Sequence, residues 1–589
     1  MSGDDYADTP RPTRRSLLAA TGTGLAALSA GCVDRVQSLM TRDSPSTVSL
    51  SVKTVPADTD PVATTIARRL VEHLSMSGID ADIVLQRESE LYRDVLINHD
   101  FDLYVGRYPG RYDPDFLYSL LRSTFAGEPG WQNPFGFADL HVDDLLDAQR
   151  STSGSARRAH VSDVQHEIAS QQPFTPLAHP DVLGAVRTDR FEGWHRFPVD
   201  SPLRYLALEA AGVAADGGRT RLRVATTDAR VTQNLNPLAV EFRSHGTLLG
   251  LLYDPLARYV EGELLPWQAR TWSWDDGTAT LELRDEATWH DGTPLTADDV
   301  AFTYRFLADT SLGNRDSAVP APRFRGRSSL VDNVSVVDDH TLRLSCGDAS
   351  PEVAERAFTL PVLPRHIWEA KRRPADIAGV LQFDGITEAL VWSNRSPVGS
   401  GPLRVADVTE GTSLTLERFD DYALTGVDDP LDPSVAFDEL SVHVVPSDAA
   451  AISLVGEGDA DATAMPLIPS AVPRVVRDDD LTLLSDRSQS FYHVGYNNRQ
   501  SPLTNPRFRR VVARLLDKRA LVDSVFDGYA RPTVSPLPRP WVPDDLTWED
   551  GNPRSPFYGR DGDFDVTAVR EAFRDAGYAY TNGGRLTDQ

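Results

Sequence analysis

The sequence predicts a two-lobed α/β protein, and three observations support this: its length, its apolar content and its succession of strand and helix patterns. The chain has 589 residues, more than a single hydrophobic core ordinarily organises, so two or more lobes are expected. Hydrophobic residues make up 41% of the chain, which is enough to build packed cores and excludes a disordered protein.

A strand–helix–strand pattern opens the part that we expect to fold. Residues 47–55 and 79–85 alternate as strands. Between them, Asp60 can cap a helix whose first turn begins with Pro61. Such a unit is normally parallel and right-handed. The helix carries apolar residues at four-residue intervals on one face: Val62, Ile66, Leu70 and Leu74.

The charge composition is strongly acidic and poor in lysine. The net charge is −27, and only three of the 59 basic residues are lysines, namely Lys53, Lys371 and Lys518. This surface is typical of a halophilic protein, because a Debye length of about 3 Å at 1 M salt screens self-repulsion. It also excludes nucleic acid as an expected partner, since phosphate neutralisation needs basic patches.

The first residues have the pattern of an export signal. Arg14 and Arg15 precede an apolar, small-residue stretch that runs to Gly31. Paired arginines in this place are typical of a twin-arginine signal, and the stretch is short for a membrane span. An uncleaved N-terminal anchor helix is the alternative interpretation. In both cases the rest of the chain is expected outside the cytoplasm.

Cys32 ends this stretch in a sequence that resembles a lipoprotein cleavage box. Ser29 stands where such a box usually has a branched apolar residue, so the match is incomplete. We predict lipidation at Cys32, followed by a polar tether over residues 33–47. Cys346, in contrast, ends an apolar run and is expected to be a buried small residue.

Residues 289–300 (WHDGTPLTADDV) carry the most specific motif of the chain. Residues 291–292 form a tight turn, and Thr296 can cap the helix that follows, with two aspartates in its first turn. The run resembles the signature of the oligopeptide/dipeptide-binding proteins, the family 5 solute-binding proteins of ABC transporters.

Further segments resemble the same family in the family's own order. They include a strand near the start, a Gly-rich turn, the crossover strand and the helices after it. These segments are residues 221–228, 234–237, 251–256, 396–403, 456–461, 490–497, 505–510 and 516–519, followed by a helix with Val566, Val569 and Phe573 on one face and Gly577 as its C-cap.

The front of the chain resembles the C-terminal third of that family. Its matching segments are residues 101–103, 113–115, 133–137, 143–146 and 173–177. We therefore predict a circularly permuted order, which is tolerated when termini lie close together. A fusion of two incomplete copies is the alternative, but it would leave apolar faces uncovered.

The predicted parts of the chain follow from this order. They are residues 1–32 as twin-arginine lipoprotein signal, 33–47 as tether, 48–170 as the second part of lobe II, 171–210 as the return segment to lobe I, 211–219 as joining linker, 220–489 as lobe I, and 490–589 as the crossover and first part of lobe II.

The resemblance implies a type II periplasmic-binding-protein fold of the large peptide-binder class, with a hinge between two α/β lobes. It also implies capture of a peptide or similar small polar solute in the cleft, and delivery to ABC permease and ATPase subunits. A monomer anchored by lipid on the outer face of the cytoplasmic membrane is expected. A sensor without transport, or a degenerate copy that binds nothing, remains an alternative.

Seven residues are predicted to line the ligand cleft, because aromatic side chains offer rigid area and polar ones can orient a solute. They come from the expected crossover run and from segments expected to face the cleft, and they are Tyr108, Arg111, Trp392, Tyr492, His493, Tyr496 and Asn497.

Gly110 marks a departure from the peptide binders of the family. These carry an aspartate three residues before the Asp-Pro turn, where it neutralises the peptide amino terminus. Here that place is Gly110, with Arg111 beside it and Asp113 opening the turn. The resemblance thus implies a solute with an anionic or neutral polar end, or a peptide held in another way.

No pattern in the chain predicts an enzyme. HExxH, GxSxG and paired CxxC motifs are absent, and the thirteen histidines lack metal-ligand spacing, so neither a cofactor nor a metal is expected. Acid pairs at residues 143–144 and 298–299 are interpreted as solvated surface.

Overall fold

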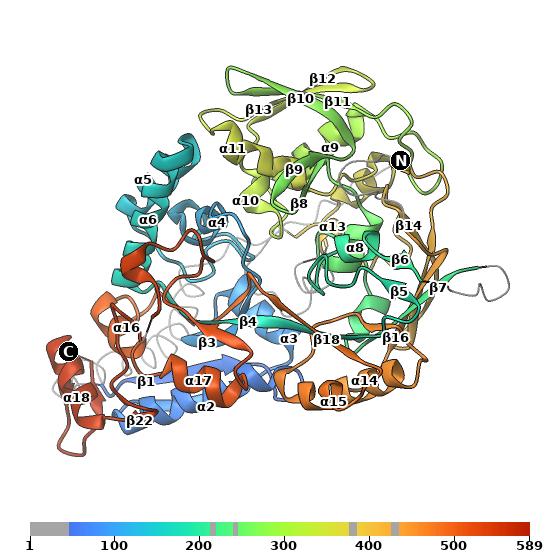
Figure 1. Cartoon of the computed structure of the whole chain (residues 1–589). Helices are drawn as coiled ribbons and strands as arrows, with labels where there is room; N and C mark the ends of the chain where they lie inside the picture. Colours follow the sequence, from blue (N-terminus) through green and yellow to red (C-terminus); the bar gives the residue numbers. More distant parts are fainter. Residues whose placement is uncertain are drawn as a thin grey trace, which may run out of the picture.

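Two hydrophobic cores divide the protein into two lobes, which Figure 1 shows on either side of a central strand region. The computed structural model describes residues 46–211, 219–239, 246–375, 386–425, 435–549 and 551–588. Lobe I is built around buried residues between positions 182 and 484. Lobe II is built from residues 48–178 together with residues 491–586. The predictions for Arg14, Arg15 and Cys32 lie outside the described residues.

One long sheet runs through both lobes. Its lobe I half is mixed, and its lobe II half ends in parallel strands. The strand order is β14 (Leu403–Thr409), β15 (Ser413–Arg418), β16 (Glu439–Val444), β7 (Arg221–Thr226), β17 (Ala462–Thr463), β4 (Phe174–Val186), β19 (Phe491–Tyr496), β3 (Leu103–Tyr108), β1 (Ser49–Thr54) and β2 (Asp80–Leu85).

Strand β4 is shared by the two lobes. Its first residues pair with β19 in lobe II, and residues 181–186 pair with β18 (Thr482–Arg487) in lobe I. The chain returns between the lobes a second time through residues 488–490, which connect β18 to β19. The lobes are therefore joined by two adjacent antiparallel crossings, the arrangement that a hinge needs.

The predicted strand–helix–strand unit is confirmed. Helix α2 (Pro61–Met76) begins after Asp60, whose carboxylate accepts a hydrogen bond from the amide of Ala63 at 2.9 Å. Strands β1 and β2 pair in parallel, with Ser49 opposite Asp80 and Thr54 opposite Leu85. All four predicted apolar helix residues are buried against the sheet.

The predicted helix after the 289–300 motif is also confirmed, as α9 (Ala297–Ala308). Its capping box joins Thr296 to Asp299, which also accepts a hydrogen bond from the amide of Arg365 at 2.9 Å. Asp299 and Asp143 are 7% and 5% exposed, so one member of each acid pair is not solvated surface as predicted. Each is buried because it caps or bonds nearby backbone amides.

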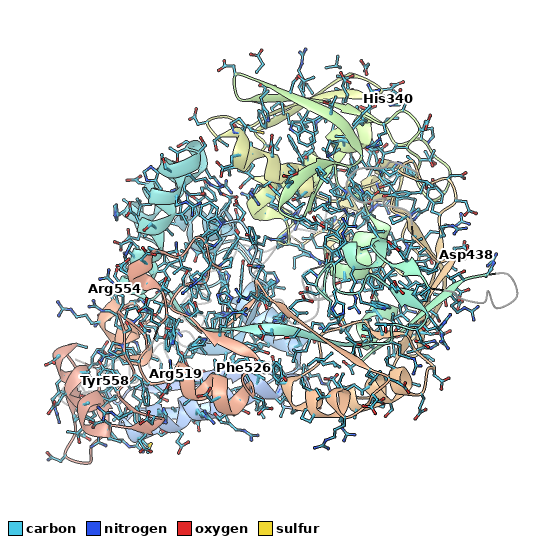
Figure 2. All side chains as sticks on the ribbon, viewed as in Figure 1. His340, Asp438, Arg519, Phe526, Arg554 and Tyr558 are labelled. Atoms are coloured by element: carbon cyan, nitrogen blue, oxygen red, sulfur yellow. The ribbon has the colours of Figure 1, made fainter. Side chains whose placement is uncertain are left out.

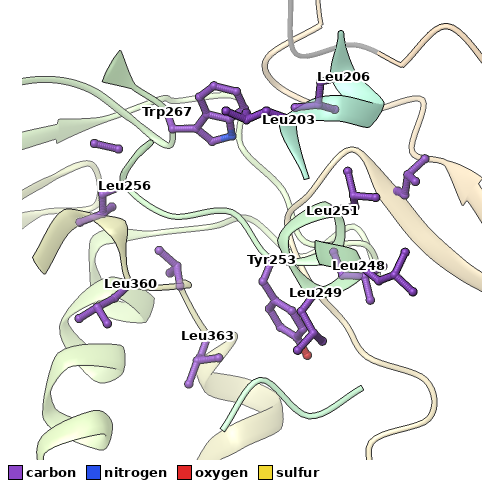
Figure 3. Packing of buried hydrophobic residues seen from close by; sticks show 14 of the residues in the cluster. Leu203, Leu206, Leu248, Leu249, Leu251, Tyr253, Leu256, Trp267, Leu360 and Leu363 are labelled. Carbon is purple, nitrogen blue, oxygen red and sulfur yellow. The ribbon is translucent and has the colours of Figure 1, made fainter. Parts of the chain in front are cut away.

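The lobe I core packs α8 (Gly246–Leu252) and α9 between the long sheet and a smaller four-stranded sheet. Figure 3 shows part of this packing, with Leu248, Leu249 and Leu251 near Tyr253. Cys346 is buried at 4% exposed, as predicted. The smaller sheet has the order β10 (Ala269–Asp275), β11 (Thr278–Leu283), β13 (Thr341–Ser345) and β12 (Asn333–Asp338).

The two ends of the described chain meet in lobe II. The amide of Val48 donates to the carbonyl of Leu586 at 2.9 Å, and Thr47 forms an antiparallel bridge with Thr587. Helices α16 (Pro506–Val512), α17 (Lys518–Val525) and α18 (Val566–Asp575) cover this lobe beside α2. Figure 2 places Arg519, Phe526 and Tyr558 here, away from His340 and Asp438 of lobe I.

Apart from the helices α5 and α6, the remaining α-helices and strands are short. They are α3 (Glu88–Tyr92), α4 (Phe116–Leu121), α5 (Leu140–Ser151), α6 (Gly154–Gln171), α7 (Leu203–Leu206), α10 (Arg325–Ser328), α11 (Pro351–Ala354), α12 (Arg365–Trp368), α13 (Glu388–Val391), α14 (Asp448–Gly456), α15 (Val472–Val476), β5 (Phe191–Glu192), β6 (Glu209–Ala210), β8 (Ala257–Val260), β9 (Glu263–Pro266), β20 (Ala530–Pro532), β21 (Gly559–Arg560), β22 (Asp563–Phe564), β23 (Ala579–Tyr580) and β24 (Leu586–Thr587).

Lys518 opens α17 with its ammonium group inside the fold. The residue is 5% exposed, and its Nζ donates a hydrogen bond to the carbonyl of Thr533 at 2.8 Å. Burial lowers the pKa of Lys518 from 10.5 to about 7. Between these two pH values the unfolded chain holds a proton that the folded chain releases, so folding stability rises with pH.

We predict that Lys518→Met removes this pH dependence. The free energy of unfolding of the wild type, minus that of the variant, should increase between pH 7 and pH 10, by at most about 1.4 kcal/mol per pH unit. Urea denaturation at constant salt measures both quantities. A difference that stays constant over this range would contradict a neutral Lys518 in the folded protein.

Candidate functional site

A cavity of about 760 Å³ lies between the two lobes, within the range of roughly 300–1,000 Å³ that is usual for small-molecule sites. Its walls come from the loop after β3, the segment before α7, the β8–β9 turn, the region of α10 and the crossing at residues 488–489. Aromatic residues form much of the lining, namely Tyr108, Tyr112, Phe116, Trp131, Tyr259, Phe324 and Trp541.

The lobe II wall is shaped by the Asp113-Pro114-Asp115 turn. Strand β3 ends at Tyr108, and α4 begins directly after Asp115. The amide of Asp115 donates to the Asp113 carboxylate at 2.8 Å, which holds the turn in place. Both aspartates are buried, at 5% and 4% exposed, so their charges need partners.

Asp113 finds one partner in each lobe. Its Oδ1 lies 2.8 Å from Nη2 of Arg157 in lobe II, and its Oδ2 lies 2.7 Å from Nη2 of Arg356 in lobe I. Arg157 is fully buried and also donates to Glu352 of lobe I at 2.8 Å. Burial alone would lower the pKa of Arg157, but the carboxylates of Asp113 and Glu352 outweigh it and raise that pKa.

Asp115 carries a second connection through Arg150 of α5. The guanidinium binds the Asp115 carboxylate at 2.7 and 3.0 Å and then reaches lobe I, where it donates to the carbonyl of Gly326 at 2.9 Å and to Ser329. We call Asp113, Asp115, Arg150, Arg157, Glu352 and Arg356 the interlobe clamp. Charge-assisted hydrogen bonds of this kind are among the stronger ones in proteins, and here they hold the lobes closed over the cavity.

Two of the seven predicted ligand residues line this cavity. Tyr108 is 3% exposed and forms its floor, with its ring 5.9 Å from that of Phe116 and 5.7 Å from that of Trp131. Arg111 is exposed at the cavity wall.

The other five predicted residues lie away from the cavity lining. All six residues of β19 are buried, because this central strand is covered on both faces. Tyr492 donates to Asp60 at 2.9 Å, and His493 bonds the hydroxyl of Tyr104 at 2.8 Å. Burial lowers the pKa of His493 to about 3, so its imidazole is neutral.

The remaining predicted residues have similar packing roles. The hydroxyl of Tyr496 bonds Thr175 at 2.6 Å, and Asn497 donates to the carbonyl of Phe101 at 2.8 Å. Trp392 packs edge-to-face on Trp368 in lobe I. We therefore leave Trp392, Tyr492, His493, Tyr496 and Asn497 out of the proposed ligand set.

The clamp residues were missed by sequence reasoning except for the 113–115 turn itself. Arg157 and its partner Glu352 are 195 residues apart, so no local pattern could pair them. The usable signal was the Asp-Pro-Asp run, which places two carboxylates on a turn that follows a buried strand.

Gly110 leaves no room for a side chain. Its φ is +56°, and a Cβ atom would lie 1.8 Å from the carbonyl oxygen of Gln489. The left-handed backbone and this close approach both require glycine. A carboxylate therefore cannot stand at this position without moving the crossing at Gln489.

Within the described ranges, no helix has the length and apolar character to cross a membrane. The same ranges hold no group of three or more histidine, cysteine, aspartate or glutamate residues that could bind a metal ion.

The fold and the cavity define a two-lobed solute-binding protein. The chain belongs to the bacterial extracellular solute-binding proteins of family 5, because the model described as "Bacterial extracellular solute-binding proteins, family 5 Middle" matches residues 263–588.

Curated relatives are similar over part of their length. The oligopeptide-binding protein AppA of Bacillus subtilis is 23% identical over 54% of this chain and 51% of its own. The probable ABC transporter periplasmic-binding protein SapA of Escherichia coli is 29% identical over 49% of this chain and 53% of its own. The chain thus spans about half the length of these relatives. A solved structure of B. subtilis AppA with a nonapeptide is 18% identical with a TM-score of 0.44, and covers 62% of this chain and 66% of its own.

We predict that Arg356→Gln loosens the interlobe clamp while preserving the fold. Asp113 keeps its lobe II partner Arg157, so only the bond between Asp113 and lobe I is lost, while the interlobe bonds of Arg150 and Arg157 remain. Loss of one charge-assisted hydrogen bond should raise the open population about 10- to 100-fold. Small-angle X-ray scattering should then report a larger radius of gyration for the unliganded variant.

The matched control is Arg404→Gln. Arg404 pairs with Glu417 at 2.8 Å on the surface of lobe I, and both side chains are at least one-third exposed. This variant should scatter as the wild type does. An unchanged radius of gyration for Arg356→Gln would contradict the role of the clamp.

Proposed function

We propose that this protein is the extracytoplasmic solute-binding component of an ABC importer and is not an enzyme. It captures a peptide or a similar small polar solute between its lobes and delivers it to a membrane permease with its ATPase subunits. The observation that carries this proposal is the aromatic, charged cavity of about 760 Å³ between two lobes that are joined by two crossings.

The interlobe clamp supports capture by closure. A solute that contacts both walls adds to the interlobe bonds of Arg356 with Asp113 and of Arg157 with Glu352, so it favours the closed arrangement. A permease that recognises only the closed form would then distinguish the loaded protein from the empty one. The names of the relatives AppA and SapA, an oligopeptide-binding protein and an ABC transporter binding protein, agree with this proposal.

We further propose that the protein is a monomer held on the outer face of the cytoplasmic membrane. The supporting features are the twin-arginine pattern at Arg14 and Arg15 and the lipoprotein-like Cys32. A single lipid chain of moderate length binds a membrane only marginally, so a lipoprotein of this kind needs more than one acyl chain for firm attachment. The acidic, lysine-poor composition supports work at high salt.

A circularly permuted order is part of the same proposal. Residues 46–48 and 586–588 are hydrogen-bonded neighbours, with the amide of Asp588 3.0 Å from the carbonyl of Ser46. In the family order proposed here, these two segments would be continuous, and the chain would open near residues 211–219. The core of lobe II, built from both regions, argues against two incomplete copies.

Thermal unfolding against a ligand panel tests the proposed function. Residues 33–589, in high salt, should melt at a higher temperature with peptides than with sugars or organic anions. A ligand at 100 times its dissociation constant adds about 2.7 kcal/mol to the free energy of unfolding. A shift produced by sugars alone would contradict a peptide solute, and no shift with any compound would favour a protein that does not bind these classes.

Restoring the family order tests the permutation. The variant begins at residue 220, runs to residue 588, and continues through a short glycine-serine linker to residue 46 and the segments after it. This variant should fold into the same two lobes. The linker only has to span a hydrogen-bonded pair, so the cooperative melting transition should persist. Loss of soluble, cooperatively folded protein would count against the permuted order.

A further inference from the structure

The side chain of Asp200 enters the interlobe cavity from lobe I. We propose that Asp200 binds the protonated amino group of the captured solute and thereby sets specificity for amine-bearing ligands such as peptides with a free amino terminus. This inference rests on the proposed function and names the residue that would recognise its solute.

Local structure directs Asp200 toward the cavity. Phe197 and Val199, on either side of Pro198, are 6% and 0% exposed and anchor the segment in the lobe I core. The hydroxyl of Thr247 donates to the backbone carbonyl of Asp200 at 2.7 Å, which fixes the peptide group. Asp200 itself is exposed, and it lines the cavity together with Ser201.

The Asp200 carboxylate makes no hydrogen bond or ion pair with another residue of the described chain. Its charged neighbours are Arg107 of β3, Arg204 of α7 and Asp486 of β18. Arg107 donates instead to Ser490 at 2.7 Å, and Arg204 lies over the ring of Trp194 at 4.6 Å with all three guanidinium nitrogens unbonded. Both arginines therefore attract the carboxylate without satisfying its hydrogen-bonding capacity.

The cavity walls partly enclose the Asp200 carboxylate, and this enclosure favours the binding of a cationic hydrogen-bond donor. Desolvation raises the pKa of Asp200, and the attraction of Arg107 and Arg204 only partly opposes it. A carboxylate that is partly desolvated by cavity walls and has no hydrogen bond from the protein favours a cationic donor, because an ammonium group supplies both the bonds and the opposite charge.

The same cavity provides for the other end of a dipolar solute. Arg111 and Arg487 are exposed at its wall, and Arg323 lines it from lobe I. A peptide carboxylate fits these guanidinium groups, which bind such anions in a bidentate way. A zwitterion bound in this way adds no net charge to the cavity.

Asp200 also explains how an amino group can be received when position 110 has no carboxylate. Gly110 is closed to any side chain by Gln489, and both residues line the same cavity as Asp200. The carboxylate thus comes from lobe I, the opposite wall. A solute whose amine binds lobe I while its body lies on Tyr108 of lobe II would bridge the cleft.

The experiment compares Asp200→Asn with Asp486→Asn as a matched control. Asp486 is a neighbouring aspartate whose pKa is also raised by burial, but it does not line the cavity. Each protein is incubated with an equimolar tripeptide library and, separately, with the same library N-acetylated. Retained peptides are then quantified by mass spectrometry, and circular dichroism with thermal melting checks that each variant folds.

The wild type and Asp486→Asn should retain free-amine peptides about 10- to 100-fold better than acetylated ones. Asp200→Asn should lose this preference while still retaining some peptide. Equal retention of both libraries by the wild type, or an unchanged preference in Asp200→Asn, would overturn the role of Asp200 and leave peptide capture standing. No retention of either library by the wild type would overturn peptide capture itself, and the role of Asp200 with it.

Discussion

The pairing of Asp113 with one arginine from each lobe is the interaction on which the closed structure depends. Arg157 anchors the carboxylate within lobe II at 2.8 Å, and Arg356 ties it to lobe I at 2.7 Å. Because Asp113 is buried, both bonds form in a region of reduced dielectric, where charge-assisted bonds are strong and unpaired charges are unfavourable. A separation of the lobes leaves Asp113 with Arg157, so opening does not strand a buried charge.

The backbone limits this motion to a hinge. Strand β4 is hydrogen-bonded to β19 at one end and to β18 at the other, and residues 488–490 run beside its middle. The second crossing lines the cavity through residues 487–489, and Gln489 lies directly against Gly110. Rotation about these crossings therefore changes the cavity and the clamp together, while the two cores stay intact.

Local features of the fold were predictable from the sequence, and long-range ones were not. Asp60 and Thr296 cap helices through atoms three residues away, so the order of residues alone identifies them. The crossover strand β19 was also predicted from the sequence. The burial of both of its faces was not predicted. Residue alternation separates the two faces of a strand, but it does not say whether a face meets a helix or an open cleft.

The same limit explains the site. Tyr108 and Arg111 were predicted because they precede a recognisable turn, and both line the cavity. Tyr492 and His493 were predicted because they belong to the crossover strand, whose six residues are all buried and outside the cavity lining. Asp200 sits in a short, irregular segment with no motif, and only its position opposite lobe II reveals it. The proposed role of Asp200 depends on its carboxylate having no hydrogen-bond or ion-pair partner in the described chain, and no sequence pattern can show this.

Capture of a solute between lobes that close on it changes the distance between the lobes. Spin labels on Leu85→Cys in lobe II and Val337→Cys in lobe I, both in exposed positions, would report the distance between lobes once buried Cys346 is replaced by alanine. Pulsed electron paramagnetic resonance should show a shorter and narrower distance distribution when the tripeptide library is added. Peptide binding with no change in that distribution would contradict capture by lobe closure.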